Sequence, residues 1–334
     1  MKIFITGAAG FIGGNFALKQ LNNTKNKILN FDKLTYAGNL NTLSSIEGNE
    51  RYTFVQGDIT DASQVWESIS TFKPDAIVNF AAESHVDRSI DGPMAFLNTN
   101  IMGTAVLLEA CRKYLDENSN LRDSFRFLHV STDEVYGSLG VDGFFTEDTS
   151  YDPSSPYSAS KASSDHLVRA WQRTFNVPTL ITNCSNNYGP WQYPEKLIPV
   201  VITKILRNKK IPIYGKGQNI RDWIHVEDHV NALIKISNKG EIGETYNIGG
   251  NNELTNIDLV NQICEIIDKK IPKKNSYKKL ISFVEDRLGH DFRYSIDSTK
   301  MKKNINFKLH YNIKKGLLQT VSWYLKNKNW LLQK

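Results

Sequence analysis

The chain has 334 residues, of which 40% are hydrophobic and 23% are charged, so it can bury a large core as one domain or as two that share an interface. No stretch approaches the roughly 20 apolar residues that cross a bilayer, and the first residues read directly into a strand and a turn, which leaves no room for a signal peptide. We therefore expect a cytoplasmic protein with no membrane partner.

The cysteines argue against a disulfide-bonded or zinc-binding protein, and the charge distribution argues against a nucleic-acid-binding protein. The three cysteines are far apart, odd in number and without CxxC spacing, so we expect neither a disulfide framework nor a zinc site. The net charge of +6 is uneven, because residues 298–334 contain many lysines and no acidic residue. These lysines alternate with apolar residues instead of forming one basic arm, which favours a solvated face over a nucleic-acid site.

Apolar runs alternate with segments of helical period through the first half of the chain. The predicted strands cover residues 2–6, 27–31, 53–55, 76–80, 125–131 and 179–183. The predicted helices between them cover residues 13–21, 62–70, 98–114 and 158–175. This alternation predicts an α/β fold with a Rossmann-like, doubly wound parallel sheet.

After residue 183 the pattern loosens into turns rich in Asn, Gly and Pro, with predicted helices near 195–206, 227–237 and 256–267. This region is too interrupted to fold alone, so we expect a smaller C-terminal α+β substrate lobe at the carboxyl edge of the sheet. The predicted dinucleotide domain is 1–184, with about 221–249 returning to it. The lobe then comprises 185–220 and 250–334.

A glycine motif follows the first predicted strand and opens a helix, with Gly7, Gly10 and Gly13 in GxxGxxG spacing. Glycines permit a tight turn and let backbone N–H groups approach a pyrophosphate. Asp32 ends the next strand, where an acid accepts hydrogen bonds from a ribose diol and repels a 2′-phosphate. The pattern predicts NAD in preference to NADP, the alternative being a glycine-rich turn without a ligand.

Two further segments fall where the cofactor would lie. Asp58 lies where an adenine-side contact is expected, although it could instead cap the helix that begins near residue 62. The segment after the fourth strand could line the nicotinamide ribose or serve only as packing at the strand end. It contains Phe80, Ala81, Ala82 and Ser84.

Tyr157 and Lys161 are four residues apart in a predicted helix, so their side chains share a face. The lysine would lower the tyrosine pKa, normally near ~10, and allow it to act as a base. Asp133 and Glu134 follow a strand end at the sheet edge. If buried, one carboxyl keeps its proton as an acid while the other is a base; the alternative is a turn or helix cap with solvated carboxylates. An extra acid and base indicate water elimination between two hydride transfers.

Several long motifs together resemble one family, the nucleotide-sugar 4,6-dehydratases of the extended short-chain dehydrogenase/reductase superfamily, and within it the enzymes that act on dTDP-glucose. The likeness runs from the glycine motif almost to the C-terminus, with one departure at Leu288, where the family usually has proline. The matching segments are residues 32–39, 81–89, 132–134, 186–190, 194–199, 221–223 and 286–291.

The resemblance implies a mechanism with NAD as cofactor and dTDP-glucose as substrate. Tyr157, assisted by Thr132 and Lys161, takes the proton of the sugar 4-hydroxyl while hydride leaves C4. Glu134 then removes the C5 proton while Asp133 protonates the departing 6-hydroxyl. Water leaves, hydride returns to C6 and a proton returns to C5, which gives dTDP-4-dehydro-6-deoxy-glucose. The resemblance also implies a homodimer built on the helices near 98–114 and 158–175.

The resemblance further implies the ligand contacts. For the cofactor these are Phe11, Ile12, Asp32, Lys33, Leu34, Thr35, Asp58, Ile59, Thr99 and Asn187. For the substrate they are Ser84, Thr132, Asn186, Lys196, Leu197, Pro212, Ile213, Tyr214, Arg221, Asn256, Asp286, Arg287 and His290. Lys196 and Arg221 suit two phosphates, although without the family an exposed lysine and a structural contact between Arg221 and Asp222 would be favoured.

Two other hypotheses stay open. The chain could be a 4,6-dehydratase or an epimerase that acts on another, UDP-linked nucleotide sugar. It could also be a non-catalytic NAD-binding or RNA-binding protein that uses its basic C-terminal part, which the intact set of candidate catalytic residues speaks against. No metal is expected, because the histidines lack ligand spacing with a carboxylate or cysteine.

Overall fold

The computed structural model describes residues 1–332. Its centre is a seven-stranded sheet in the order β10-β6-β5-β4-β1-β2-β3, in which every neighbouring pair is parallel. The strands are β1 (Lys2–Thr6), β2 (Lys27–Asp32), β3 (Tyr52–Gln56), β4 (Ala76–Asn79), β5 (Arg126–Thr132), β6 (Thr179–Cys184) and β10 (Thr245–Ile248). The strand order reverses between β1 and β4, as in a doubly wound fold, so the predicted α/β class is confirmed.

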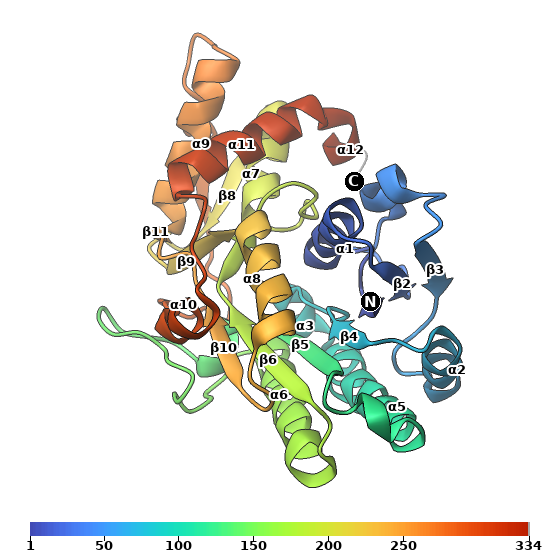
Figure 1. Cartoon of the computed structure of the whole chain (residues 1–334). Coiled ribbons are helices and arrows are strands. Elements are labelled where there is room, and N and C mark those ends of the chain that lie inside the picture. Colours follow the sequence, from blue (N-terminus) through green and yellow to red (C-terminus); the bar gives the residue numbers. More distant parts are fainter. Residues whose placement is uncertain (333–334) are drawn as a thin grey trace.

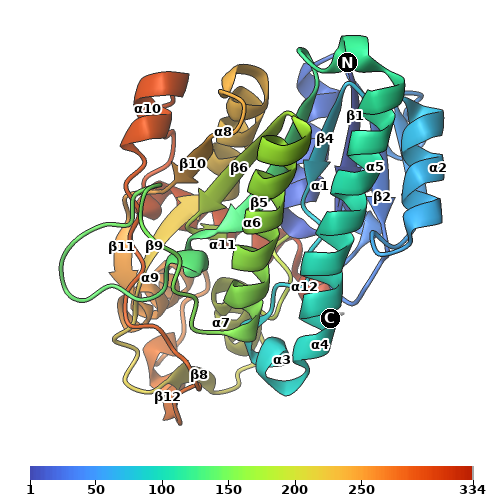
Figure 2. The same ribbon diagram turned by 90° about the horizontal axis from the view of Figure 1, so that it is seen from below.

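Helices cover both faces of this sheet (Figures 1 and 2). One face carries α1 (Phe11–Asn23) and α8 (Val226–Lys239), and the other carries α2 (Ala62–Phe72), α5 (Gly103–Glu117) and α6 (Pro156–Phe175). The alternation of side chains along a strand explains this, since Ile3 and Ile5 of β1 belong to the core on one face and Phe4 to the core on the other.

The predicted helix at 98–114 is part of a longer helical run. It starts with α4 (Pro93–Phe96), passes through a π-helical turn (Leu97–Met102) and continues as α5; the short α3 (Val86–Asp91) precedes it. By length and composition, Pro93–Glu117 could cross a membrane, but 44% of its most apolar window is buried. Since α5 packs between α2 and α6, a core helix accounts for this apolar character.

A smaller lobe packs beside the carboxyl ends of the large sheet. It contains a three-stranded sheet in the order β11-β9-β7 and a pair formed by β8 and β12. The strands are β7 (Asn186–Tyr188), β8 (Ile211–Tyr214), β9 (Ile220–His225), β11 (Glu253–Thr255) and β12 (Ile281–Val284). The helices of this C-terminal part are α7 (Leu197–Leu206), α9 (Asn256–Lys270), α10 (Thr299–Ile305), α11 (Ile313–Lys326) and α12 (Lys328–Leu332). Between β9 and β11 the chain returns to the large sheet through α8 and β10.

The basic C-terminal segment is amphipathic. In α11, Leu317, Val321 and Tyr324 are buried in the core of the smaller lobe, while Lys314 and Lys315 are exposed. The lysines therefore lie on the outer face of a packed helix, as expected for a solvated basic face.

Candidate active site

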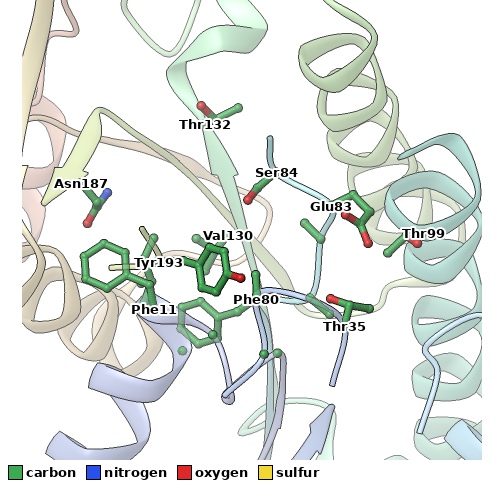
Figure 3. A pocket seen from close by; sticks show the side chains of 18 of the residues that line it. Phe11, Thr35, Phe80, Glu83, Ser84, Thr99, Val130, Thr132, Asn187 and Tyr193 are labelled. Atoms are coloured by element: carbon green, nitrogen blue, oxygen red, sulfur yellow. The ribbon is translucent and has the colours of Figure 1, made fainter. Parts of the chain in front are cut away.

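A cavity of about 310 Å³ opens at the carboxyl edge of the large sheet, where the strand order reverses. Its walls come from the segments that follow β1 to β6 and from the loop before α7. Figure 3 shows Thr132 at the end of β5, with Asn187 on one side and Ser84 on the other. This is the position at which open α/β sheets bind their ligands.

The glycine motif forms a turn that has no room for side chains. Gly7 has a φ of +73°, and a Cβ there would lie 2.7 Å from the backbone nitrogen of Ala81. A Cβ on Gly13 would lie 2.6 Å from the Gly7 carbonyl oxygen. Gly10 is the N-cap of α1 and offers no side-chain cap, so N–H groups of the first turn remain available to an anionic ligand.

Asp32 is buried at the end of β2, where its carboxylate accepts hydrogen bonds from the backbone N–H of Ala9 at 2.9 Å and of Leu34 at 2.8 Å. Burial raises the pKa of Asp32, and these two hydrogen bonds oppose the rise. Each carboxylate oxygen keeps a lone pair, as a ribose diol requires. Leu34, a predicted cofactor contact, does not line the cavity; it serves Asp32 through its backbone.

Asp58 lines the cavity and forms an ion pair with Lys33 at 2.6 Å. It does not cap α2, because Asp61 accepts hydrogen bonds from the first-turn nitrogens of Ser63 and Gln64, both at 3.0 Å. The capping alternative for Asp58 is therefore wrong. Apart from Leu34, the other predicted cofactor residues also line the cavity, namely Gly7, Gly10, Phe11, Ile12, Gly13, Asp32, Lys33, Thr35, Ile59, Phe80, Ala81, Ala82, Ser84, Thr99, Tyr157, Lys161 and Asn187.

Thr132, Asp133 and Glu134 share the cavity at the end of β5. Asp133 begins a 3-10 turn (Asp133–Tyr136) whose N-cap is Thr132, with the Glu134 N–H donating to the Thr132 hydroxyl at 3.3 Å. Asp133 is 2% exposed, and its Oδ2 atom has no hydrogen-bond partner. The alternative of a turn cap with solvated carboxylates is therefore wrong for Asp133.

The two carboxyl groups differ in electrostatic surroundings. Burial, followed by the charge of Glu134, raises the pKa of Asp133 well above its ordinary value. Burial also raises the pKa of Glu134, but the positive charges of Arg287, Lys196 and Arg221 oppose this rise. The rise in pKa is therefore opposed by more positive charges at Glu134 than at Asp133, so the two neighbouring carboxyl groups have different surroundings.

Tyr157 lies in the first turn of α6, which a capping box between Ser155 and Ser158 fixes. The Lys161 ammonium donates to the carbonyl oxygen of Val130 at 2.9 Å. Burial and the charge of Glu134 raise the pKa of Tyr157 well above its usual value. The spacing to Lys161 predicted a lower pKa for Tyr157, whereas in this structure burial and the charge of Glu134 raise it.

Among the predicted substrate residues, Ser84, Thr132, Asn186 and Lys196 line this cavity. The Lys196 ammonium donates to the carbonyl oxygen of Ser84 at 2.7 Å. The remaining residues do not line it, although they lie in the smaller lobe that faces it. They are Leu197, Pro212, Ile213, Tyr214, Arg221, Asn256, Asp286, Arg287 and His290.

Two arginines of the smaller lobe differ in their free donors. The Arg221 side chain donates to the carbonyl oxygens of Ile220, Asp291 and Phe292 and not to Asp222, so the Arg221–Asp222 alternative is wrong. Arg287 lies 3.7 Å from the Asp87 carboxylate, and its Nε atom is buried without a partner. Arg287 therefore offers the freer donor to a phosphate.

Two other predicted substrate residues are already engaged. The Ile213 side chain is buried in the core of the smaller lobe, so only its backbone is free to meet a ligand. The His290 ring contacts the Asp286 carboxylate at 2.6 Å.

Several residues that line the cavity were not predicted from the sequence. Glu195 is the most informative, because its Oε1 atom accepts a hydrogen bond from the Tyr36 hydroxyl at 3.2 Å and thereby joins the two lobes. Its position beside Lys196 in a matching motif was the available signal. The others are Phe31, Ala37, Gly38, Gly57, Glu83, Val130, Ser131, Cys184, Ser185, Gln192 and Tyr193. Within residues 1–332, no group of three or more His, Cys, Asp or Glu side chains is arranged to hold a metal ion.

Comparisons with known proteins cover nearly the whole chain. The sequence pattern of a family described as GDP-mannose 4,6 dehydratase matches residues 4–320. A dTDP-glucose 4,6-dehydratase from Shigella flexneri is 53% identical over 341 residues, which cover 99% of this chain and 94% of the relative.

Solved structures extend the likeness to three dimensions. A dTDP-glucose 4,6-dehydratase from Bacillus anthracis in complex with NAD matches with a TM-score of 0.88 at 46% identity, covering 99% of this chain and 98% of that one. A dTDP-glucose 4,6-dehydratase double mutant from Streptomyces venezuelae, solved with NAD bound, matches with a TM-score of 0.92 at 40% identity and the same coverage. With this coverage, the matches extend over both lobes.

Proposed function

The chain belongs to the family of the dTDP-glucose 4,6-dehydratases, and we propose that it removes water from dTDP-glucose to give dTDP-4-dehydro-6-deoxy-glucose, with NAD as cofactor. The observation that carries this proposal is the buried Asp133, whose Oδ2 atom has no partner, directly beside Glu134 at the sheet edge. A simple dehydrogenase needs neither carboxyl group, whereas an elimination needs an acid and a base.

The cavity fits NAD by its donors and its shape. The glycine turn leaves no space for a Cβ and presents the first turn of α1 to a pyrophosphate, and the Asp32 carboxylate suits the ribose diol. When bound, NAD supplies the chemistry of a reversible hydride acceptor. Phe11 and Ile12, in the first turn of α1, would contact its pyrophosphate, and Thr35, Thr99 and Asn187 would contact its other parts.

The protein's own groups then divide the proton transfers. Tyr157, with Thr132 beside it, takes the proton of the 4-hydroxyl, and Lys161 supplies positive charge behind it. Glu134 takes the proton at C5, which the neighbouring C4 ketone makes acidic. Asp133 gives its proton to the departing 6-hydroxyl. The raised pKa of Asp133 supports this last role, because an acid that is protonated near neutral pH is needed there.

The smaller lobe would bind the nucleotide and its phosphates. Lys196, Arg221 and Arg287 all act electrostatically on Glu134, so they surround the sugar position with positive charge. Such charge suits a diphosphate. The division into a dinucleotide domain (1–184 with about 221–249) and a substrate lobe (185–220 and 250–334) is part of this proposal.

We also propose a cytoplasmic homodimer that contacts neither membrane nor nucleic acid. Apolar side chains on the outer faces of α5 and α6 support the dimer, because Val106 and Trp171 are only partly buried and line a second, open hollow together with Trp66 of α2. Light scattering of the purified protein tests the oligomeric state, and a monomer at micromolar concentration would contradict it.

The activity is tested by incubating the purified protein with dTDP-glucose and, separately, with UDP-glucose. We expect a 4-keto-6-deoxy product that has lost one water from dTDP-glucose, and no net change in cofactor. The Tyr157→Phe variant is the control for hydride transfer. Turnover of UDP-glucose alone would favour the alternative of a dehydratase or epimerase for another nucleotide sugar, and no product from either would overturn the proposal.

A further inference from the structure

Helix α6 presents four polar side chains at strict four-residue spacing, namely Tyr157, Lys161, Asp165 and Arg169. Residues four apart lie on neighbouring positions of one helix face, and this helix lies across β5 and β6 (Figure 2). Lys161 is 4% exposed and Asp165 is 0% exposed. The order of charges along this face is a candidate base, a cation, an anion and a second cation.

His129 of β5 lies between the lysine and the aspartate. Its Nε2 atom is 3.4 Å from the Lys161 ammonium and 3.4 Å from the Asp165 Oδ1 atom. Its Nδ1 atom is 3.1 Å from the amide nitrogen of Asn79. The Asn79 carbonyl accepts from the Thr6 hydroxyl, so its NH₂ group faces the ring. His129 Nδ1 is therefore an acceptor, and the proton of the neutral ring lies on Nε2, which is 3.2 Å from the Ser164 hydroxyl; Asp165 Oδ1, at 3.4 Å, has no hydrogen-bond partner in the described part of the chain.

The charge state of His129 agrees with this geometry. Burial first, and then the charge of Lys161, lower the pKa of His129 to about 4. The ring is thus neutral at physiological pH. A neutral ring cannot balance the ammonium, so the charge of Lys161 must be balanced elsewhere.

Asp165 has the surroundings of a permanently ionised carboxylate. Its Oδ2 atom accepts hydrogen bonds from the hydroxyls of Ser131 and Tyr151, both at 2.9 Å, and from the Asn183 amide at 3.3 Å. Burial raises its pKa, but His129, Lys161 and Ser131 outweigh that effect and hold the pKa below its usual value. A buried anion with this set of donors is stable only with positive charge nearby.

We propose that Asp165 is a positioning residue for hydride transfer, because its buried carboxylate is the counter-charge that keeps Lys161 in its ammonium form, with neutral His129 between the two. The inference rests on the proposed function, in which Lys161 supplies positive charge behind Tyr157. It adds Asp165 and His129 to that pair, although neither lines the cavity.

The titratable and charged groups that face this cluster come from several elements. They are His129 from β5, Lys161 and Arg169 from α6, Tyr136 and Tyr151 from the segment between β5 and α6, and Cys184 from β6. Arg169 reaches the cluster through the Tyr151 hydroxyl at 2.8 Å. Asp165 is the carboxylate among these groups, so its removal takes away the negative charge that opposes the lowering of the Lys161 pKa.

The sign of the effect follows from the surroundings of Lys161. Burial lowers the pKa of Lys161, and the Asp165 charge opposes this lowering. Without that charge the ammonium loses its proton at a lower pH. In the pH profile of turnover, the rate should fall on the alkaline side where Lys161 becomes neutral. This alkaline limb should then move to lower pH.

The test is the pH profile of dTDP-glucose turnover for the wild type, Asp165→Asn, Asp165→Glu and Ser164→Ala. We expect the alkaline limb of Asp165→Asn to move by about one pH unit toward neutral pH, the size expected for loss of one nearby opposite charge. Asp165→Glu keeps the charge and should keep the limb in place. Ser164→Ala is the neutral control, because it removes a hydroxyl 3.2 Å from His129 Nε2 without changing any charge.

A loss of turnover in Asp165→Asn with an unmoved alkaline limb would overturn the inference, because it would show a purely structural role. If Asp165→Asn does not fold, ¹⁵N NMR of lysine side chains in the wild type decides. A Lys161 signal that stays in the ammonium form above pH 8 supports the inference, and an amine signal at neutral pH overturns it. Absence of wild-type turnover would instead contradict the proposed function, so the two failures are distinguishable.

Discussion

Glu134→Gln should separate the two halves of the proposed reaction. The change keeps the size and shape of the side chain and removes one negative charge. As general base, Glu134 should contribute roughly 10²–10⁴-fold to the elimination, which corresponds to about 3–5 kcal/mol of the barrier. The overall rate should fall by this factor.

The first hydride transfer should respond in the opposite way. After burial, the charge of Glu134 is the largest cause that raises the pKa of Tyr157, and it also raises the pKa of Asp133. Removing that charge lowers the pKa of Tyr157, so the tyrosine becomes a base at lower pH. In the pH–rate profile of the first hydride transfer, the acid limb should therefore move to lower pH, while the rate of elimination falls.

Rapid mixing with dTDP-glucose provides the assay. Absorbance of the reduced cofactor should rise and persist in Glu134→Gln, and the quenched sugar should be the 4-keto form that still holds its 6-hydroxyl. Glu147→Gln is a matched control, because Glu147 is a partly buried carboxyl with a raised pKa that does not line the cavity. Full turnover by Glu134→Gln, or failure to accumulate reduced cofactor, would refute the assignment of the base.

The Asp133→Asn variant should still exchange the C5 hydrogen with solvent, as measured by deuterium incorporation, while its rate of water loss falls by roughly 10²–10⁴-fold. Equal loss of exchange and of water elimination would assign Asp133 only to sugar binding. Gly7→Ala should lower the free energy of unfolding by at least about 1–2 kcal/mol and weaken NAD binding, because φ is +73° and the Cβ would meet the backbone after β4. Gly140→Ala, where a Cβ meets nothing within 4 Å, is its control in thermal unfolding with and without NAD. Glu253 accepts hydrogen bonds from Arg293 at 2.6 and 2.9 Å. Burial raises the pKa of Glu253, but the contact with Arg293 holds this pKa below its ordinary value of 4.5. The Glu253–Arg293 pair should stabilise the fold by about 1–2 kcal/mol above about pH 4.5, and this stabilisation should be lost as pH falls through the folded-state pKa. Chemical denaturation should therefore give Glu253→Gln the same free energy of unfolding as the wild type in acid only.

Local patterns in the sequence determined the large sheet and the outline of the cavity. The six predicted strands are present within two residues at each end, because hydrophobic runs and turn residues act over short distances. The GxxGxxG turn and the four-residue spacing of Tyr157 and Lys161 likewise depend on one element each. The seventh strand, β10, and the short strands of the smaller lobe were not predicted from the sequence, because their pairing joins segments far apart in the chain.

Only the tertiary structure decided how the site residues behave. It gave Asp133 and Glu134 different surroundings, and it raised the pKa of Tyr157 where the spacing alone predicted a lower one. It also placed Asp165 behind Lys161 through His129, which lies on another element. The physical reason is that spacing along one helix or strand fixes the direction of a side chain, whereas its charge and hydrogen bonds depend on burial and on groups brought from distant parts of the chain.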